Sequence, residues 1–546
     1  MRLLIADDTP HPYYKEFIER LRRQRPDDEC VLCSNATEAW KRLSNPQGKP
    51  FGLVILDHRM GGGVNDGTEL LRRLHKEPIN PAPIIIYITA AFNELPANEI
   101  AGIGTAVAMF VDKEDRSDGV LFRAVQLFAR QVESPLHEPE RIFGAAFIDE
   151  VMSEVKVILE TQQTGYLSLD QQRVVASLIR SFFTTLRMKS SWTAADAHEL
   201  SVFLTEGLCR VYDLPEEMIG LVRRFGDWEE ILYTIPRYRD HFLHQIKVYL
   251  LGFCIINKLN RSRQLTDTPL GTSDGLKIWF MTAAFHDIGY PFEKVAMWLE
   301  TYILGVLKSP TEESGAPFNF PVVMNWGALF GRRHHFYHFE RIIDSICRTY
   351  GAHLDKATMG AARAELSTAL SARIAETPDH AIFSALVVQN FLRGRLRDEE
   401  IDPVAMAIAL HNAGVFRNIR KPLGGLLHFR SDPLSFILMF CDTAQEWGRF
   451  GIEDVSRRSS VGSPIRFDGL TVSQDGKSVA VRLRFGTDWA PREVREWKER
   501  VYEKHLQTLR TVWSGRGTGN DGVSFSIAYS HGQSPDACKG LDEVVL

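Results

Sequence analysis

The feature that most restricts the fold of this chain is an apolar segment that ends in two polar residues, His286 and Asp287. Residues 278–285 are almost entirely apolar, which predicts a buried helix, and Gly289 and Pro291 are typical of a helix end. Neighbouring residues on a helix point about 100° apart, so the two side chains serve one centre most easily at the last turn. Imidazole and carboxylate are ligands that Zn, Fe or Mn accept. The segment therefore predicts a metal-binding helix end in an apolar core.

Further polar residues interrupt apolar helical segments elsewhere in the chain. They are His244, His380, His411 and Asp442. An unpaired polar group buried in such a segment costs several kcal/mol, so repeated placements of this kind are hard to explain as unrelated core residues. Their order, with the first pair included, is His, His-Asp, His, His, Asp. We expect these side chains to meet around one metal centre.

This order resembles that of the HD superfamily of metal-dependent phosphohydrolases, an all-helical fold, over residues 236–450. The resemblance implies an enzyme, a phosphohydrolase or phosphodiesterase, with one or two divalent cations of Mn, Fe, Zn or Mg. Its metal ligands would be His244, His286, Asp287, His380, His411 and Asp442. Asp287 would bridge two cations. Asp240, four residues before His244, and His241 are candidates to protonate a leaving oxygen.

The substrate implied is a phosphoester of nucleotide type, whose phosphates need cations. The candidates are Lys294, Arg417, Arg420 and Lys421. His335 and His338, three residues apart, are a competing ligand pair. The chain departs from the HD-GYP subfamily because its Gly-Tyr-Pro tripeptide directly follows the His-Asp pair instead of following the core. Two alternatives stay open: a cyclic-dinucleotide phosphodiesterase, and a degenerate HD domain that binds a nucleotide or a protein as a non-catalytic signalling scaffold.

Residues 1–131 alternate between strand-like and helix-like segments. Strands are predicted at 3–6, 29–32, 51–56, 84–88 and 106–111, and helices at 12–23, 37–43, 67–76 and 117–131. Continuous apolar strands with helical crossovers predict a doubly wound α/β domain with a five-stranded parallel sheet, flavodoxin-like, covered on both faces. Ligands of such a sheet gather at the carboxyl ends of its strands. Polar residues follow those ends, namely Asp7, Asp8, Asp57, Thr89 and Lys113.

These five residues suggest a specific chemistry. Clustered carboxylates repel one another and favour a divalent cation such as Mg²⁺, and Asp57 can act as a nucleophile toward a phosphoryl donor while Lys113 neutralises the developing charge. All five positions match the receiver domain of response regulators, and Phe110 matches the aromatic residue of its switch. The resemblance implies that a sensor histidine kinase phosphorylates Asp57. Two departures from the family are the Gly-rich loop after Asp57 and Glu114 in place of the usual proline.

The remaining segments carry no catalytic motif. Residues 132–235 have apolar residues at helical spacing and predict a helical connector, either a stalk for a homodimer or part of the output core. Residues 451–546 predict a small α+β appendage, a lid or a partner surface. Its strands are predicted at 470–472, 479–484 and 523–529, with a hairpin turn at 474–476 and a helix at 492–512.

Composition limits the classes of protein that remain. The chain has 546 residues, a net charge of −5 and 44% hydrophobic residues, which predicts a globular protein of about three domains without dedicated nucleic-acid binding. No apolar run approaches the ~18 residues of a membrane span, and the start of the chain turns acidic too early for a secretory signal. The seven cysteines are scattered, as is typical of reduced thiols in the cytoplasm.

Overall fold

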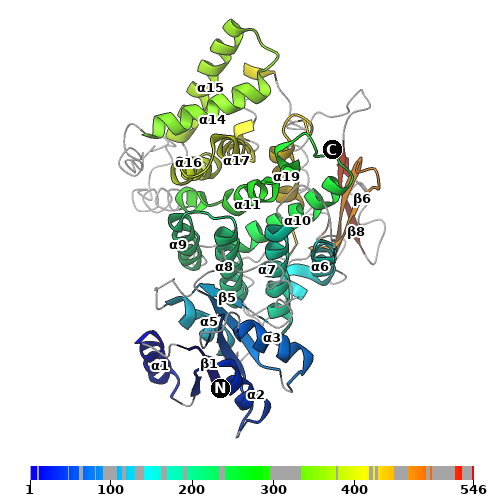
Figure 1. Ribbon diagram of the computed structural model, residues 1–546. Helices are drawn as coiled ribbons and strands as arrows, with labels where there is room; N and C mark the ends of the chain where they lie inside the picture. The colour runs from blue at the N-terminus through cyan, green and yellow to red at the C-terminus, as the bar shows by residue number, and fades with distance from the viewer. Residues whose placement is uncertain are drawn as a thin grey trace. The chain divides into compact units, whose positions relative to one another are not determined.

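The computed structural model (Figure 1) divides the chain into two units, Met1–Leu214 and Pro215–Leu546. The structure describes residues 2–8, 12–26, 28–46, 48–58, 60, 66–79, 82–89, 107, 109–112, 119–129, 140–160, 169–188, 194–232, 240–294, 334–376, 379–412, 414–416, 422–424, 428–447, 465–486, 492, 494, 523–531 and 544–545.

The first unit contains the predicted parallel sheet. Its strands are β1 (Arg2–Ala6), β2 (Glu29–Cys33), β3 (Leu53–Asp57), β4 (Ile84–Thr89) and β5 (Met109–Asp112). All neighbours pair in parallel in the order β2-β1-β3-β4-β5, which is the doubly wound, flavodoxin-like order with a switch point between β1 and β3. The central β3 is buried along its whole length, as strands covered on both faces must be. The predicted fold class of this part is confirmed.

Helices cover both faces of this sheet. They are α1 (Pro12–Gln24), α2 (Ala36–Ser44), α3 (Asp66–Lys76) and α5 (Gly119–Ala129). Phe17 of α1 packs edge-on against Phe122 of α5, while Arg73 of α3 lies over the Trp40 ring of α2. Figure 1 shows these two pairs on opposite sides of the sheet. The predicted boundaries were wrong by one or two residues at most ends. For example, Asp57 and Thr89 were predicted to follow their strands, but they still pair with the neighbouring strand as the last residues of β3 and β4.

Three longer helices complete the first unit, namely α6 (Ala145–Glu160), α7 (Leu169–Met188) and α8 (Ala194–Val211). A π-helical turn at Glu140–Gly144 precedes α6, and its Phe143 packs edge-on against Phe182 and Phe183 of α7. The next helix, α9 (Glu216–Leu232), falls in the second unit. The segment predicted as a connector is therefore divided between the two units.

The second unit is mainly helical. Its described helices after α9 are α10 (Phe242–Arg261), the short η3 (Pro269–Gly271), α11 (Gly275–Phe285), α14 (His334–Tyr350), α15 (Lys356–Glu376), α16 (His380–Leu392), α17 (Asp398–Leu410) and α19 (Pro433–Ala444). All residues of α11 except Lys277 are buried, because α10, α17 and α19 surround the helix. This burial explains why the segment is apolar on all sides instead of on one stripe.

A four-stranded sheet follows these helices. Its strands are β6 (Ile465–Val472), β7 (Ser478–Phe485), β8 (Ser524–His531) and β9 (Val544–Val545), in the order β6-β7-β8-β9. The hairpin between β6 and β7 turns at Gly476, whose φ of +69° suits glycine. Phe525 of β8 packs against Phe436 and Phe440 of α19, with ring centroids 4.9 Å apart in both pairs. Of the helix predicted at 492–512, only residues 492 and 494 are described.

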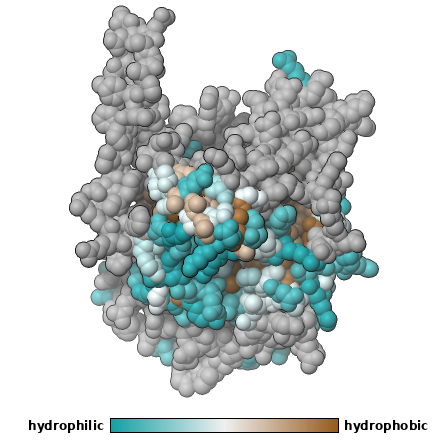
Figure 2. Space-filling view, turned by 90° about the horizontal axis from the view of Figure 1, so that it is seen from above, coloured by the Kyte–Doolittle hydropathy of each residue, from teal (hydrophilic) through white to brown (hydrophobic). Residues whose placement is uncertain are grey.

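The described residues include no helix that is both long enough and apolar enough to span a membrane. On the face seen in Figure 2, hydrophilic side chains predominate among the described residues, and hydrophobic ones occupy small separate areas.

The crossing of α10 and α11 leads to a prediction about stability. Gly252 of α10 leaves room for the buried Trp279 of α11, since a Cβ at Gly252 would lie 1.9 Å from Trp279 Cζ2. Trp279 is fixed there by donating from Nε1 to the Tyr249 carbonyl at 2.9 Å. We expect Gly252→Ala to reduce the free energy of unfolding by roughly 1–3 kcal/mol through overpacking, seen as a lower midpoint in thermal unfolding.

Gly360 provides the matched control for this substitution. It lies in helix α15, and a Cβ there would meet nothing within 4 Å. Gly360→Ala should stabilise by up to about 1 kcal/mol, because alanine has the higher helix propensity. Equal midpoints for Gly252→Ala and the native protein would contradict the packing described here.

Candidate metal centre

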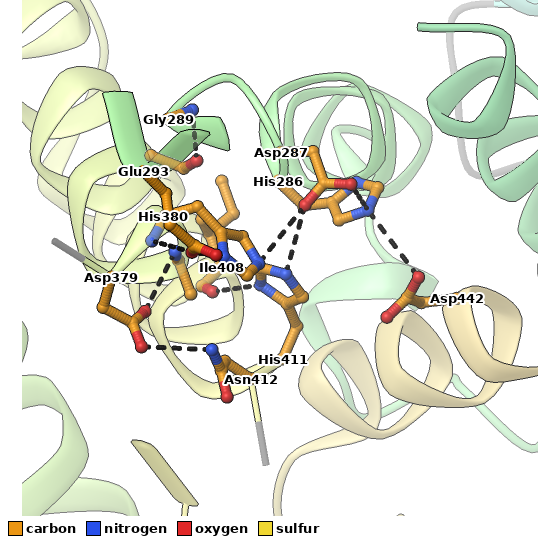
Figure 3. Close-up of polar contacts among 12 residues, drawn as sticks. His286, Asp287, Gly289, Glu293, Asp379, His380, Ile408, His411, Asn412 and Asp442 are labelled. Atoms are coloured by element: carbon orange, nitrogen blue, oxygen red, sulfur yellow. Dashed lines mark hydrogen bonds and ion pairs between the residues drawn. The ribbon is translucent and has the colours of Figure 1, made fainter. Parts of the chain in front are cut away.

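Six side chains predicted as metal ligands lie together in the second unit, and Figure 3 labels all of them except His244. They are His244, His286, Asp287, His380, His411 and Asp442. Helix α10 carries the first, the end of α11 the next two, α16 the fourth, the end of α17 the fifth and α19 the last. Elements separated by up to about two hundred residues in sequence thus contribute polar groups to one point in an apolar core.

One subset of these ligand atoms gathers around His286. The Nε2 atom of His286 is 3.4 Å from Asp287 Oδ2 and 4.0 Å from Asp442 Oδ1. The Nε2 atom of His244 is 2.8 Å from the same Asp442 oxygen and 4.0 Å from Asp287 Oδ2. We call this group of His244, His286, Asp442 and Asp287 Oδ2 the first position.

A second subset faces the other oxygen of the same aspartate. The Nε2 atoms of His380 and His411 both lie 3.5 Å from Asp287 Oδ1. We call Asp287 Oδ1, His380 and His411 the second position. Asp287 thus stands between the two positions with one carboxylate oxygen toward each, as a bridging ligand would.

The Nδ1 atoms of the four histidines all point away from this centre. His286 Nδ1 donates to the Ala283 carbonyl at 2.8 Å, and His411 Nδ1 donates to the Ile408 carbonyl at 2.6 Å. These acceptors lie three residues earlier in each chain segment, so they fix the histidine tautomer locally. With Nδ1 turned to these partners, Nε2 is the nitrogen that faces the centre, which is how metal-binding histidines are usually held.

The other two histidines have partners from distant segments. His244 Nδ1 contacts Gln445 Oε1, and His380 Nδ1 contacts Glu293 Oε2 at 2.5 Å. The Gln445 amide donates in turn to the Trp447 carbonyl at 2.6 Å, which fixes its orientation.

Burial and charge set the protonation of the centre. Burial lowers the pKa of His286 to about 4, although Asp287 acts in the opposite direction. Burial would raise the pKa of Asp287, but the neighbouring histidines, with His286 first, outweigh it and hold that pKa well below its usual range. Burial would also lower the pKa of His380, but the hydrogen bond to Glu293 and the charge of Asp287 raise it to about 9. The centre therefore combines a neutral imidazole with an ionised carboxylate.

These residues fit a divalent cation. His286 Nε2 is buried and has no hydrogen-bond partner among the described residues, and a bound cation would compensate its desolvation. The unprotonated Nε2 of His286 also faces Asp287 Oδ2 at 3.4 Å and Asp442 Oδ1 at 4.0 Å, and such contacts are favourable only with a proton or a cation between them. Four nitrogen and two carboxylate donors of this type suit Mn, Fe or Zn.

The other predicted residues of this part have different outcomes. Asp240 Oδ1 accepts from the Leu243 backbone N–H at 2.9 Å in the first turn of α10, whose N-cap residue is His241. His241 stacks on the Tyr290 ring with centroids 3.5 Å apart. Lys294 Nζ lies 4.5 Å above the same ring. Three predicted substrate-binding residues, Arg417, Arg420 and Lys421, fall outside the described residues. The side chain of His335 is also outside them.

Sequence reasoning missed several residues that support the centre. Glu293 and Gln445 were not identified, although each contacts the Nδ1 atom of a histidine of the centre. Gly289 was interpreted as closing a helix, which is incomplete, because it also allows close packing: a Cβ there would lie 2.5 Å from the His380 carbonyl oxygen. The Gly289 backbone N–H donates to Ser384 Oγ at 2.8 Å, which holds α16 against the His-Asp turn.

The first unit contains the predicted cluster of acids. The register pairs Ala6 with Leu56, so Asp7 and Asp57 lie side by side at the carboxyl ends of β1 and β3. Carboxylate oxygens of Asp7, Asp8 and Asp57 lie within 4.8 Å of one another. Thr89 is buried at the end of β4, and Lys113 lies outside the described residues. Three carboxylates at this spacing suit Mg²⁺.

A buried polar group next to this cluster was not predicted. His58 directly follows Asp57 in the sequence, and its Nδ1 atom lies 2.5 Å from the Tyr87 hydroxyl. That hydroxyl is also 3.0 Å from Thr68 Oγ1, and the Tyr87 ring meets Phe110 edge-on with centroids 5.8 Å apart. The acidic cluster is thereby connected through β4 to the aromatic residue of β5.

Comparisons with known proteins give little further information. No protein-family model matches the chain, and no curated protein matches it. Among solved structures, RcsB from Salmonella enterica serovar Typhimurium bound to a promoter with a phosphomimetic is 22% identical, covers 30% of this chain and 88% of its own, and has a TM-score of 0.19. Two RcsB dimers bound to two parallel DNAs are 21% identical over 37% of this chain and 98% of that one, also with a TM-score of 0.19. These TM-scores are too low to carry an argument.

Proposed function

We propose that this protein is a two-component response regulator whose output is an HD-type metal-dependent phosphohydrolase acting on a phosphoester of nucleotide type. The observation that supports it most strongly is the position of Asp287, whose two carboxylate oxygens face different histidines at 3.4–3.5 Å. A carboxylate shared in this way suits two cations, and hydrolysis of a phosphoester requires charge neutralisation at two oxygens.

The residues of the centre would divide the work as follows. His244, His286, Asp287 and Asp442 would hold one divalent cation, and Asp287, His380 and His411 a second. Such cations would supply a nucleophile from water at neutral pH and stabilise the charge on the phosphoryl group.

Access and proton transfer fall to other side chains. Asp442 is 29% exposed and His380 16%, whereas His286 is fully buried, so a substrate would approach from the side of Asp442 and His380. His241, held by stacking on Tyr290, would protonate the leaving oxygen. Lys294, beside the same ring, would bind a substrate phosphate.

The first unit would control this activity. Asp57 would accept a phosphoryl group from a sensor histidine kinase, with Mg²⁺ on Asp7, Asp8 and Asp57 neutralising the charge. Phosphorylation would then alter the packing around Thr89 and Phe110, and with it the activity or the dimerisation of the output.

Metal analysis combined with a hydrolysis panel tests the proposal. The purified protein is analysed for Mn, Fe, Zn and Mg, then assayed with nucleoside phosphates, cyclic mononucleotides and cyclic dinucleotides. Bound transition metal with turnover supports the phosphohydrolase, and turnover restricted to cyclic dinucleotides favours the phosphodiesterase alternative. Binding of nucleotides without any turnover would contradict the enzyme and favour the scaffold.

A further inference from the structure

The two histidines that depend on distant partners belong to different positions of the centre. His244, in the first position, is oriented by the neutral amide of Gln445. His380, in the second position, is oriented by the carboxylate of Glu293 at 2.5 Å. A carboxylate partner fixes the ring and makes the ligand nitrogen a stronger donor to a cation.

Glu293 also holds the helix that carries His380. The same Oε2 atom accepts from the His380 backbone N–H at 3.3 Å, so one carboxylate oxygen positions both the ring and the start of α16. The other oxygen, Oε1, lies 3.7 Å from Lys294 Nζ. Figure 3 shows Glu293 above the His380 ring, on the side opposite Asp287.

The start of α16 has one further attachment to the second position. Asp379 caps α16 by accepting from the Ala381 N–H at 3.1 Å, and its Oδ2 accepts from the Asn412 side chain at 3.0 Å. Asn412 directly follows His411, so the two histidines of the second position are coupled through this contact. The first position takes no ligand atom from α16.

We propose that Glu293 is the positioning residue of the second position and decides whether the centre binds one cation or two. The inference rests on the proposed function, since it requires that the centre binds metal. The second position has three protein ligands, Asp287, His380 and His411, so a misdirected His380 leaves only two. The first position keeps its four ligands, because Glu293 contacts none of them directly. Its one link to that position runs through His380, which contacts the shared Asp287.

Titration of the full-length protein with Mn²⁺ tests this inference. Calorimetry measures the affinity of each site, and electron paramagnetic resonance shows whether the bound ions are close together. We expect the native protein to bind two Mn²⁺ at the centre, with the signal of a spin-coupled pair. Glu293→Ala should weaken the second Mn²⁺ by about 10–100-fold, leave the first within about twofold, and give the signal of isolated Mn²⁺. Glu293→Gln should be intermediate, because its amide oxygen still accepts from His380 Nδ1.

A half-buried glutamate of another helix supplies the control. Glu340 of α14 pairs with Arg363, and Glu340→Ala should bind two Mn²⁺ like the native protein. Asp57→Ala is introduced in every protein so that Mn²⁺ at the acidic cluster of the first unit is reduced throughout. Two Mn²⁺ with native affinities in Glu293→Ala would overturn the inference but not the proposed function, and so would an equal weakening of both positions. Failure of the native centre to bind Mn²⁺ would overturn the proposed function itself.

Discussion

The Asp287→Asn variant is expected to lose phosphoester hydrolysis by about a thousandfold or more, which corresponds to about 4 kcal/mol of barrier. Asp287 is the residue that faces both positions, with Oδ2 3.4 Å from His286 and Oδ1 3.5 Å from His380 and from His411. An amide has no charge and only one oxygen, so it cannot bridge two cations. The rate of hydrolysis with the best substrate of the panel and the metal content per chain are the two measurements.

Two further measurements separate this effect from loss of folding. Asp344, a half-exposed aspartate of α14 that pairs with Arg363, gives the matched substitution Asp344→Asn, which should keep native turnover and metal content. Asp287→Asn without added metal should still unfold in a single cooperative thermal transition, at a somewhat lower midpoint because the depressed pKa of the Asp287 carboxyl stabilises the native protein. Native turnover in Asp287→Asn would show that the reaction takes place elsewhere.

The second large effect concerns the acidic cluster of the first unit. With a small-molecule phosphoryl donor and Mg²⁺, the native protein should gain one phosphoryl group, and Asp57→Ala should gain none. Asp57 lies buried at the end of β3, and its oxygens lie within 4.8 Å of those of Asp7 and Asp8. A cation bound there would neutralise the negative charge that develops when Asp57 attacks phosphorus. Intact-protein mass measured with and without the donor gives the result.

Asp28 provides the control for this experiment. It is buried before β2 and pairs with Arg25 at 2.6 Å, so Asp28→Asn changes a carboxylate of the same unit outside the acidic cluster. It should be phosphorylated like the native protein. Equal phosphorylation of Asp57→Ala would assign the acceptor to another residue.

The clustering of the six residues of the centre could be predicted because each is a polar residue where the apolar pattern requires none. Helix α11 is buried except at Lys277, and burying His286 and Asp287 at its end without polar partners would be costly. The same reasoning applied to His411, which follows the apolar α17. The sheet was predictable for a related reason, since runs of apolar residues such as those of β3 form only between two layers of helices.

The supporting residues could not be predicted, because nothing distinguishes them in the sequence. Glu293 and Gln445 lie in polar segments at helix ends, where an acid or an amide is ordinary, and only the folded chain brings them to His380 and His244. Asp240 was predicted as a proton donor from its spacing, and its hydrogen bond from the Leu243 backbone N–H could not be predicted in the same way. Spacing along a helix identifies a face but not the partner that meets it.

Anomalous X-ray diffraction from crystals of the full-length protein grown with Mn²⁺ tests the central claim most directly. We predict anomalous peaks within bonding distance of the His286 Nε2 and Asp287 carboxylate atoms, separate from any peak at Asp7, Asp8 and Asp57. A map with no peak at the six-residue centre, and with His286 Nε2 and Asp442 bonded to other protein groups, would contradict the metal centre and with it the proposed hydrolase.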